Sequence, residues 1–163
     1  MKKKFFIVVL LLLLALCCFG IYVFFEDDYR FQLEYQFYNY FPYENGKYIK
    51  VSLPADNQVQ YVGEEELFSI LGNGTGVIYF GYPSCPWCRN IVETLVDVTN
   101  RAEVPVYYVN VHRLKDSKRV ISYLEDYLNR NEEGKLTLYV PDVYFVKDGQ
   151  ILTHHISAVS GYT

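Results

Sequence analysis

The chain has 163 residues, a formal net charge of -4 and 51% hydrophobic residues, with 17 Tyr and 11 Phe among them. Once an apolar first segment is set aside, this length suits one compact domain of about 100–150 residues and argues against a second. A negative net charge without a long basic run argues against a nucleic-acid partner, since phosphate binding needs clustered Lys and Arg.

The N-terminal segment has the features of a membrane anchor. Residues 5–25 contain no charged side chain, and a helix of that length spans about 30 Å, the thickness of a bilayer's hydrocarbon core. Lysines occupy positions 2–4 and acids occupy positions 26–28, so the positive-inside rule places residues 1–4 in the cytosol as a basic flank. We therefore expect a single-pass protein of the cell membrane, with everything after the anchor outside the cytosol.

Two alternatives to an uncleaved anchor stay open. A cleaved signal peptide has an apolar region of about 7–15 residues and a small-x-small cleavage site, whereas this run is longer and no A-x-A pattern follows it. A bacterial lipoprotein signal would modify Cys17 or Cys18, but the bulky Leu16 stands where such signals have a small residue. We interpret both cysteines as small apolar residues in lipid.

Residues 26–48 interleave aromatic and polar side chains and show no sustained period of two or of 3.6. This pattern predicts a juxtamembrane stalk, or a loosely packed extension, ahead of a globular domain at 49–163. Aromatic side chains also favour the membrane interface, and docking of an accessory partner is the alternative role.

The first half of the globular part alternates strand and helix signals. We expect a short strand at 47–53 and a turn at 54–57. Acids open and glycines close an apolar stretch at 64–71, which predicts a short helix. The run VIYF at 77–80 lies between glycines and is typical of a strand buried on both faces.

The second half continues the alternation. Apolar residues recur at helical spacing over 90–102 and again over 116–130. Between these helices, VYYVNV at 106–111 predicts another buried strand. Two strands joined by Asp148-Gly149 then form the strongest hairpin signal in the chain. The order strand, helix, strand, helix, hairpin predicts an α/β fold.

The motif CPWC, from Cys85 to Cys88, lies between the predicted strand at 77–80 and the helix that follows it. Ser84 is expected to cap that helix, and Pro86 to occupy an early helical position where its missing N–H costs little. Cys85 is thereby held at a helix N-terminus, where free N–H groups and the helix dipole stabilise a thiolate and lower its pKa. We expect Cys85 to attack and Cys88, one turn further along, to resolve the mixed disulfide.

Two side chains beside the cysteines also have expected roles. Trp87 is expected to stay partly exposed and to offer an apolar platform to a peptide, with packing on the neighbouring loop as the alternative. Arg89 is expected to be a solvated side chain that adds positive charge.

A metal site is the main chemical alternative for the cysteines. A closed zinc site needs four Cys or His ligands, and outside the apolar segment the candidates are Cys85, Cys88, His112, His154 and His155. The last two are adjacent in a predicted strand, so their side chains point to opposite faces. A structural bridge would close too small a loop to constrain the unfolded chain. With no second CxxC in the sequence, we expect no metal and no cofactor beyond a redox-active Cys85–Cys88 disulfide.

The stretches VIYFGYPSCPWCRN and YVPDVYFVKDGQIL resemble the thioredoxin superfamily, over roughly residues 59–156. The resemblance implies a thioredoxin-like fold, a central mixed sheet flanked by helices, preceded here by the N-terminal transmembrane helix. Within the superfamily the chain is most similar to small bacterial proteins grouped as bacteriocin transport accessory or maturation proteins. The resemblance also implies that the Val140-Pro141 bond is cis, that Pro141 faces the dithiol, and that Val140 offers backbone groups to the substrate.

Two departures from that family stand out. Classical thioredoxins carry a buried carboxylate six positions before the first cysteine, to assist proton transfer to the second, and here that position is Tyr79. The proton acceptor for Cys88 is therefore open, with water or an acid from elsewhere as the alternatives. Little sequence also follows residue 156 for the closing helix of the fold, which indicates a truncated or atypical end.

These features together predict a membrane-anchored, extracytoplasmic thiol–disulfide oxidoreductase that acts on cysteines of exported proteins or peptides. The direction of electron flow is not assigned, and a second redox partner is needed to recycle the dithiol. The alternative is a tethered, non-catalytic module of the same fold that holds a secretion partner.

Overall fold

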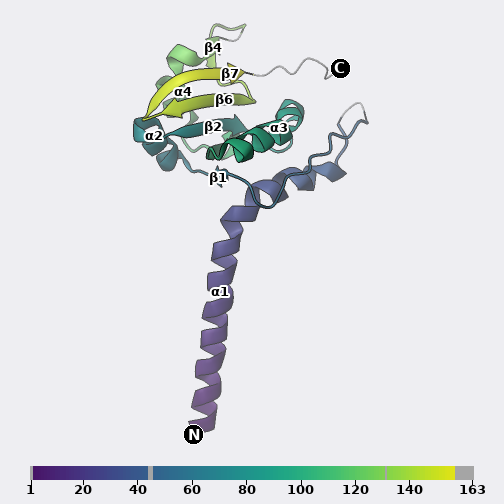
Figure 1. The fold of residues 1–163 in the computed structure, drawn as a ribbon, viewed down its shortest axis with the longest axis vertical. Helices are drawn as coiled ribbons and strands as arrows, with labels where there is room; N and C mark the ends of the chain where they lie inside the picture. Colours follow the sequence, from purple (N-terminus) through teal and green to yellow (C-terminus); the bar gives the residue numbers. More distant parts are fainter. Residues whose placement is uncertain (1, 44–45, 131, 157–163) are drawn as a thin grey trace.

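The computed structural model describes residues 2–43, 46–130 and 132–156, and within the first helix it describes side chains for residues 9–17 and from residue 29 onward. Figure 1 shows a long N-terminal helix leading into a domain built on a sheet. The helices are α1 (Lys2–Phe37), α2 (Glu64–Asn73), α3 (Pro86–Ala102) and α4 (Ser117–Tyr123), with 3-10 turns at Tyr38–Tyr40, Val111–Arg113 and Glu125–Tyr127. The strands are β1 (Val59–Tyr61), β2 (Gly76–Gly81), β3 (Val106–Asn110), β4 (Asn129–Arg130), β5 (Leu136–Thr137), β6 (Asp142–Lys147) and β7 (Gln150–Ile156).

The main sheet is mixed and has the strand order β1-β3-β2-β6-β7, while β4 and β5 form a small ladder of their own. Strands β1, β3 and β2 are parallel, β6 is antiparallel to β2, and β7 is antiparallel to β6. The β6–β7 hairpin turns at Asp148 and Gly149, both at positive φ (50° and 75°), as the Asp-Gly signal predicts. A mixed sheet flanked by helices, as expected, is consistent with a thioredoxin-like fold.

Two apolar clusters cover the two faces of this sheet. Because successive strand residues point to opposite faces, Tyr79 of β2 packs on one side with α3 and the end of α1. Ile78 and Phe80 pack on the other side with α2 and α4. Every residue of β2 is buried, which is why this strand is a continuous apolar run and confirms its prediction as a two-sided core strand.

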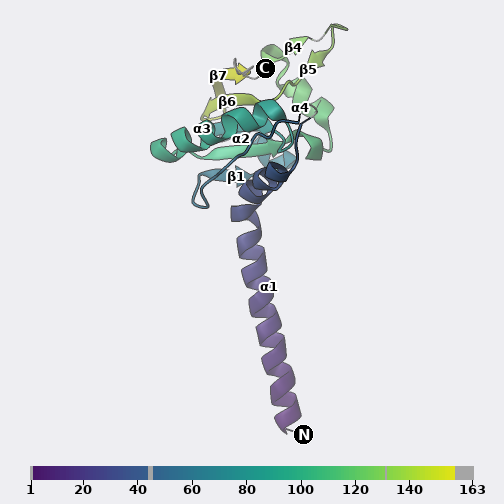
Figure 2. The same ribbon diagram turned by 90° about the vertical axis from the view of Figure 1, so that its right-hand side faces the viewer.

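The last turns of α1 belong to the domain core, and the prediction of a stalk or loosely packed extension is corrected here. Phe31 and Tyr35, one turn apart, are 1% and 0% exposed. Their ring centroids lie 4.7 and 6.0 Å from that of Tyr108 in β3. Figure 2 shows this end of α1 against the domain while the N-terminal part extends away from it. The aromatic side chains recur one helical turn apart and supply a buried helix face.

The strand predicted at 47–53 is an extended segment outside the sheet. The side chain of Asn39 takes the place of a neighbouring strand, since it both accepts from the N–H and donates to the carbonyl of Val51, each at 2.8 Å. Gln32 likewise donates to the carbonyl of Leu53 at 2.9 Å. Backbone groups near the core need hydrogen-bond partners, and here amide side chains at the end of α1 and just beyond it provide them.

The helix predicted at 116–130 is shorter than expected. It forms α4 and then continues as a 3-10 turn at Glu125–Tyr127 before the chain becomes extended in β4. Val120, Leu124 and Leu128 still pack into one cluster. A 3-10 turn keeps residues three apart on one side, so the apolar spacing does not distinguish it from α-helix.

Among the residues that the structure describes, we find no helix long and apolar enough to cross a membrane. The anchor predicted at 5–25 includes residues 5–8 and 18–25, whose side chains lie outside the described set.

Candidate functional site

Cys85 caps the N-terminus of α3 with its own sulfur. Its Sγ accepts a hydrogen bond from the backbone N–H of Cys88 at 3.3 Å, and Pro86 follows as the first helical residue. The prediction of Ser84 as the cap is therefore wrong by one residue, because Cys85 itself has the extended backbone of an N-cap (φ -70°, ψ 121°). This places the sulfur against the N–H groups that a helix leaves unpaired at its start.

The surroundings lower the pKa of Cys85 from 9.0 to about 7. The largest contribution is the hydrogen bond with the Cys88 side chain, and backbone N–H groups of Cys88 and Trp87 add to it against the opposing effect of burial. A thiol with this pKa is roughly half ionised at pH 7, against a few per cent for an ordinary cysteine. Cys85 is thus equipped to attack a disulfide.

Cys88 lies in the opposite environment. It is 0% exposed, and burial raises its pKa, with the neighbouring Cys85 sulfur raising it further. Both cysteines are free thiols. One sulfur is readily ionised while the other holds its proton, which is the asymmetry that an attacking and a resolving cysteine require.

The remaining predicted site residues lie around the same helix end. The Val140-Pro141 peptide bond is cis, and the Val140 carbonyl oxygen is 4.0 Å from the Cys85 sulfur. Trp87, two residues after Cys85 in α3, is 37% exposed and leaves part of its apolar ring at the surface. The structure therefore brings the following residues of the predicted site together: Cys85, Pro86, Trp87, Cys88, Val140 and Pro141.

Arg89 is buried at 2% exposure, which corrects the prediction of a solvated side chain. Its guanidinium donates to the carbonyls of Tyr35 (2.6 Å), Ile49 (2.6 and 3.0 Å) and Pro83 (3.1 Å), and to the side chain of Asn39. It thereby ties the dithiol helix to the end of α1 and to the loop before Cys85. The sequence does not reveal this role because the acceptors come from segments far apart along the chain.

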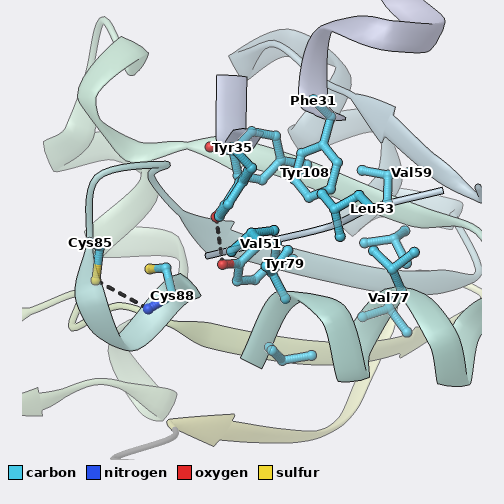
Figure 3. Packing of buried hydrophobic residues seen from close by; sticks show 14 residues of the cluster. Phe31, Tyr35, Val51, Leu53, Val59, Val77, Tyr79, Cys85, Cys88 and Tyr108 are labelled. Atoms are coloured by element: carbon cyan, nitrogen blue, oxygen red, sulfur yellow. Dashed lines mark hydrogen bonds between the residues drawn. The ribbon is translucent and has the colours of Figure 1, made fainter. Parts of the chain in front are cut away.

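A buried tyrosine pair lies behind the dithiol. The hydroxyls of Tyr35 and Tyr79 are 2.8 Å apart, and both side chains are 0% exposed. Figure 3 shows the two hydroxyls on the side of the cluster that faces Cys88. Tyr79 was singled out by the missing carboxylate, whereas Tyr35 was missed, although its spacing of four from Phe31 is a helical signal.

The histidines considered as metal ligands have other neighbours. His112 stacks on Tyr82 with ring centroids 4.1 Å apart, and His154 Nδ1 is 3.3 Å from a carboxylate oxygen of Asp142. His155 lines a groove on the face of β7 opposite His154, so the expected opposite orientation is confirmed. Within the described ranges, no group of three or more His, Cys, Asp and Glu side chains is placed to hold a metal ion.

Comparisons with known proteins give limited similarity. No family model matches the chain, and no curated protein matches it. Among solved structures, the chain is similar to thioredoxin O2 from Arabidopsis thaliana in the oxidized state, with 21% identity, a TM-score of 0.47, and coverage of 63% of this chain and 84% of that chain. It is also similar to thioredoxin O1 from the same plant in the oxidized state, with 24% identity, a TM-score of 0.46, and coverage of 63% and 88%.

Proposed function

We propose that this protein is a membrane-anchored thiol–disulfide oxidoreductase that works outside the cytosol on cysteines of exported proteins or peptides. The observation that carries the proposal is the asymmetry of the dithiol. Cys85 has a pKa lowered to about 7 at the start of α3, and the buried Cys88 donates its backbone N–H to the same sulfur at 3.3 Å.

The proposed reaction is a two-electron exchange. The Cys85 thiolate attacks a disulfide of the substrate, forms a mixed disulfide and releases one substrate thiolate. Cys88 then attacks the Cys85 sulfur, forms the Cys85–Cys88 disulfide and passes its proton to the second substrate sulfur, which leaves as a thiol. The substrate is reduced and the dithiol oxidised, and the reverse sequence oxidises a substrate dithiol. Either direction needs a redox partner to restore the starting state.

The proposed location rests on the charges that flank the apolar segment. Lysines at 2–4 and acids at 26–28 favour a cytosolic N-terminus and an extracytoplasmic domain. Disulfide chemistry persists on that side of the membrane, whereas a cytosol keeps thiols reduced. On the resemblance of its motifs, we further propose that it belongs with the bacterial accessory proteins of bacteriocin transport or maturation.

The test uses the full-length chain in detergent and follows thiol–disulfide exchange with glutathione. Wild type should equilibrate between dithiol and disulfide, and its equilibrium constant assigns it as oxidant, isomerase or reductase. Cys85→Ser should abolish the exchange, whereas Cys17→Ser, a change in an exposed cysteine of α1, should leave it intact. Exchange that survives in Cys85→Ser would overturn the proposal.

A tethered binding module that uses only its surface is the second candidate. Trp87, an exposed aromatic side chain beside the dithiol, is the observation in its favour, since such residues anchor protein interfaces. The two functions separate in cells, because a binding module keeps its phenotype and its partner when Cys85 becomes Ser and an oxidoreductase does not. For the location, a C-terminal reporter active only in the cytosol would contradict the proposed orientation.

A further inference from the structure

The buried tyrosine pair, Tyr35 and Tyr79, lies in the same apolar cluster as Cys88. Tyr79 belongs to β2, six residues before Cys85, and its side chain lies in one buried cluster with Cys88. Figure 3 shows its hydroxyl directed toward that cysteine. A Cβ on Gly81 would lie 2.7 Å from this hydroxyl oxygen. The glycine at the end of β2 therefore leaves the space that the Tyr79 hydroxyl occupies.

Tyr35 holds the Tyr79 hydroxyl in place. It reaches the pair from α1, 44 residues earlier in the chain, and its hydroxyl lies 2.8 Å from that of Tyr79, with either oxygen able to donate. The helix that carries Tyr35 is in turn fixed by Arg89, which donates to the Tyr35 carbonyl at 2.6 Å. Because Arg89 follows Cys88 directly, the tyrosine pair and the resolving cysteine are tied to the same helix.

A hydroxyl pair has chemistry that a carboxylate lacks. An ionised carboxylate only accepts hydrogen bonds, whereas each hydroxyl both donates and accepts. Burial raises the pKa of both tyrosines well above the usual value of 10.0, so neither side chain takes up or releases a proton near neutral pH. The pair therefore cannot serve as a base for Cys88, but it can supply a hydrogen bond whose direction reverses.

We propose that Tyr79, oriented by Tyr35, is a positioning residue that hydrogen-bonds the Cys88 sulfur in both of its protonation states. This inference rests on the proposed function. With Cys88 as a thiol, its S–H donates to Tyr79 and Tyr79 donates to Tyr35. With Cys88 as a thiolate, Tyr35 donates to Tyr79 and Tyr79 donates to the sulfur. The tyrosines keep their own protons throughout.

The bond matters in the step where Cys88 carries negative charge. In the resolving attack, the Cys88 proton passes to the departing substrate thiolate, and the Tyr79 hydroxyl stabilises the charge that develops on Cys88. In the reverse direction, Cys88 leaves as a thiolate and receives the same bond. The nearby Tyr79 hydroxyl lowers the pKa of Cys88 against the larger rise caused by burial, which agrees with donation to the thiolate.

The test separates the two steps with the aromatic disulfide 5,5′-dithiobis(2-nitrobenzoate). Stopped-flow absorbance records one chromophore when Cys85 attacks and a second when Cys88 resolves. The full-length chain carries Ser at positions 17 and 18 throughout, so that only the dithiol reacts. The variants are Tyr79→Phe, Tyr35→Phe and, as a matched control, Tyr108→Phe. Tyr108 is a buried tyrosine of the same cluster whose hydroxyl has no hydrogen-bond partner among the described residues.

A hydrogen bond to a charged group is worth enough to change a rate at least tenfold. We therefore expect Tyr79→Phe to slow the second phase about tenfold or more at pH 7 and to raise the pH midpoint of that phase by about one unit. The first phase should change less than about twofold, because Cys85 keeps its own hydrogen bonds. Tyr35→Phe should slow the second phase by a smaller factor, and Tyr108→Phe should change neither phase.

The inference is overturned if the second phase of Tyr79→Phe matches that of Tyr108→Phe in rate and pH midpoint. If Tyr79→Phe fails to fold, Tyr35→Phe decides, since it keeps the Tyr79 hydroxyl and removes only its partner. An unchanged second phase in that variant overturns the inference. Failure of the proposed function has a different signature, namely the absence of a Cys85-dependent first phase in wild type itself.

Discussion

Replacing Arg89 with Met tests whether one buried guanidinium joins α1 to the dithiol helix. Met keeps an unbranched side chain as long as the Arg stem up to Nε, and it removes every donor. The guanidinium donates to backbone carbonyls of Tyr35, Ile49 and Pro83. Tyr35 and Pro83 are buried and Ile49 is half-buried. After the change, water can reach the Ile49 carbonyl more easily than the other two.

The magnitude follows from these acceptors. A buried acceptor left without a donor costs about 1–3 kcal/mol, so two buried carbonyls and one half-buried carbonyl cost about 5 kcal/mol together. Removing the guanidinium also removes the cost of burying its charge, which returns part of that sum. We expect Arg89→Met to lower the free energy of unfolding by about 3 kcal/mol, or to lower the melting temperature by roughly 10 °C for a domain of this size.

The measurement is urea unfolding of the full-length chain in detergent, with the dithiol kept reduced. The matched control is Arg101→Met on the same helix, where the guanidinium pairs with Asp97 at 2.6 Å and both side chains are largely exposed. Such a surface pair contributes less than about 1 kcal/mol. If Arg89→Met and Arg101→Met unfold at the same urea concentration, Arg89 does not hold these segments together and the reasoning is refuted.

Three further predictions concern other parts of the site. Alkylation of Cys85 by iodoacetamide should titrate with a midpoint at about pH 7, and Cys88→Ala should raise the midpoint because it removes the largest contribution; an unchanged midpoint would contradict this account. Gly81→Ala should lower the free energy of unfolding by about 1–3 kcal/mol, since its Cβ would meet the Tyr79 hydroxyl at 2.7 Å; urea unfolding at the wild-type midpoint speaks against that clash. Burial raises the pKa of Asp142, so its folded pKa exceeds the unfolded one. Wild type should then lose stability relative to Asp142→Asn as the pH rises from about 4 toward neutral, whereas a difference independent of pH rules this out.

Local patterns were sufficient for the elements that carry the dithiol. A continuous apolar run between glycines indicated β2 because both faces of that strand are buried. The Asp-Gly pair at 148 and 149 indicated the hairpin because few residues adopt positive φ at both positions of a turn. Cys85 followed by Pro86 placed the reactive sulfur at a helix start, and only the capping residue was assigned one position too early.

The errors fall where a residue's role depends on distant segments. From the sequence, Arg89 was expected to be a solvated side chain. The groups that accept hydrogen bonds from its buried guanidinium lie 6 to 54 residues earlier in the chain. The segment at 47–53 has the composition of a strand, yet Asn39 supplies the hydrogen bonds that a neighbouring strand would have supplied. The spacing of apolar residues within a segment does not indicate hydrogen-bond partners that lie in a distant segment.

The sequence by itself determined the position of the dithiol, the order of the elements around it and the absence of a carboxylate at residue 79. These are local properties, set by burial pattern, turn geometry and helix capping over a few residues each. Only the tertiary structure brought Tyr35 of α1 within 2.8 Å of Tyr79 and buried Arg89 between α1 and α3. Such contacts depend on how helices pack across a sheet face, where the partner is chosen by space and by unsatisfied hydrogen bonds rather than by neighbours in the chain.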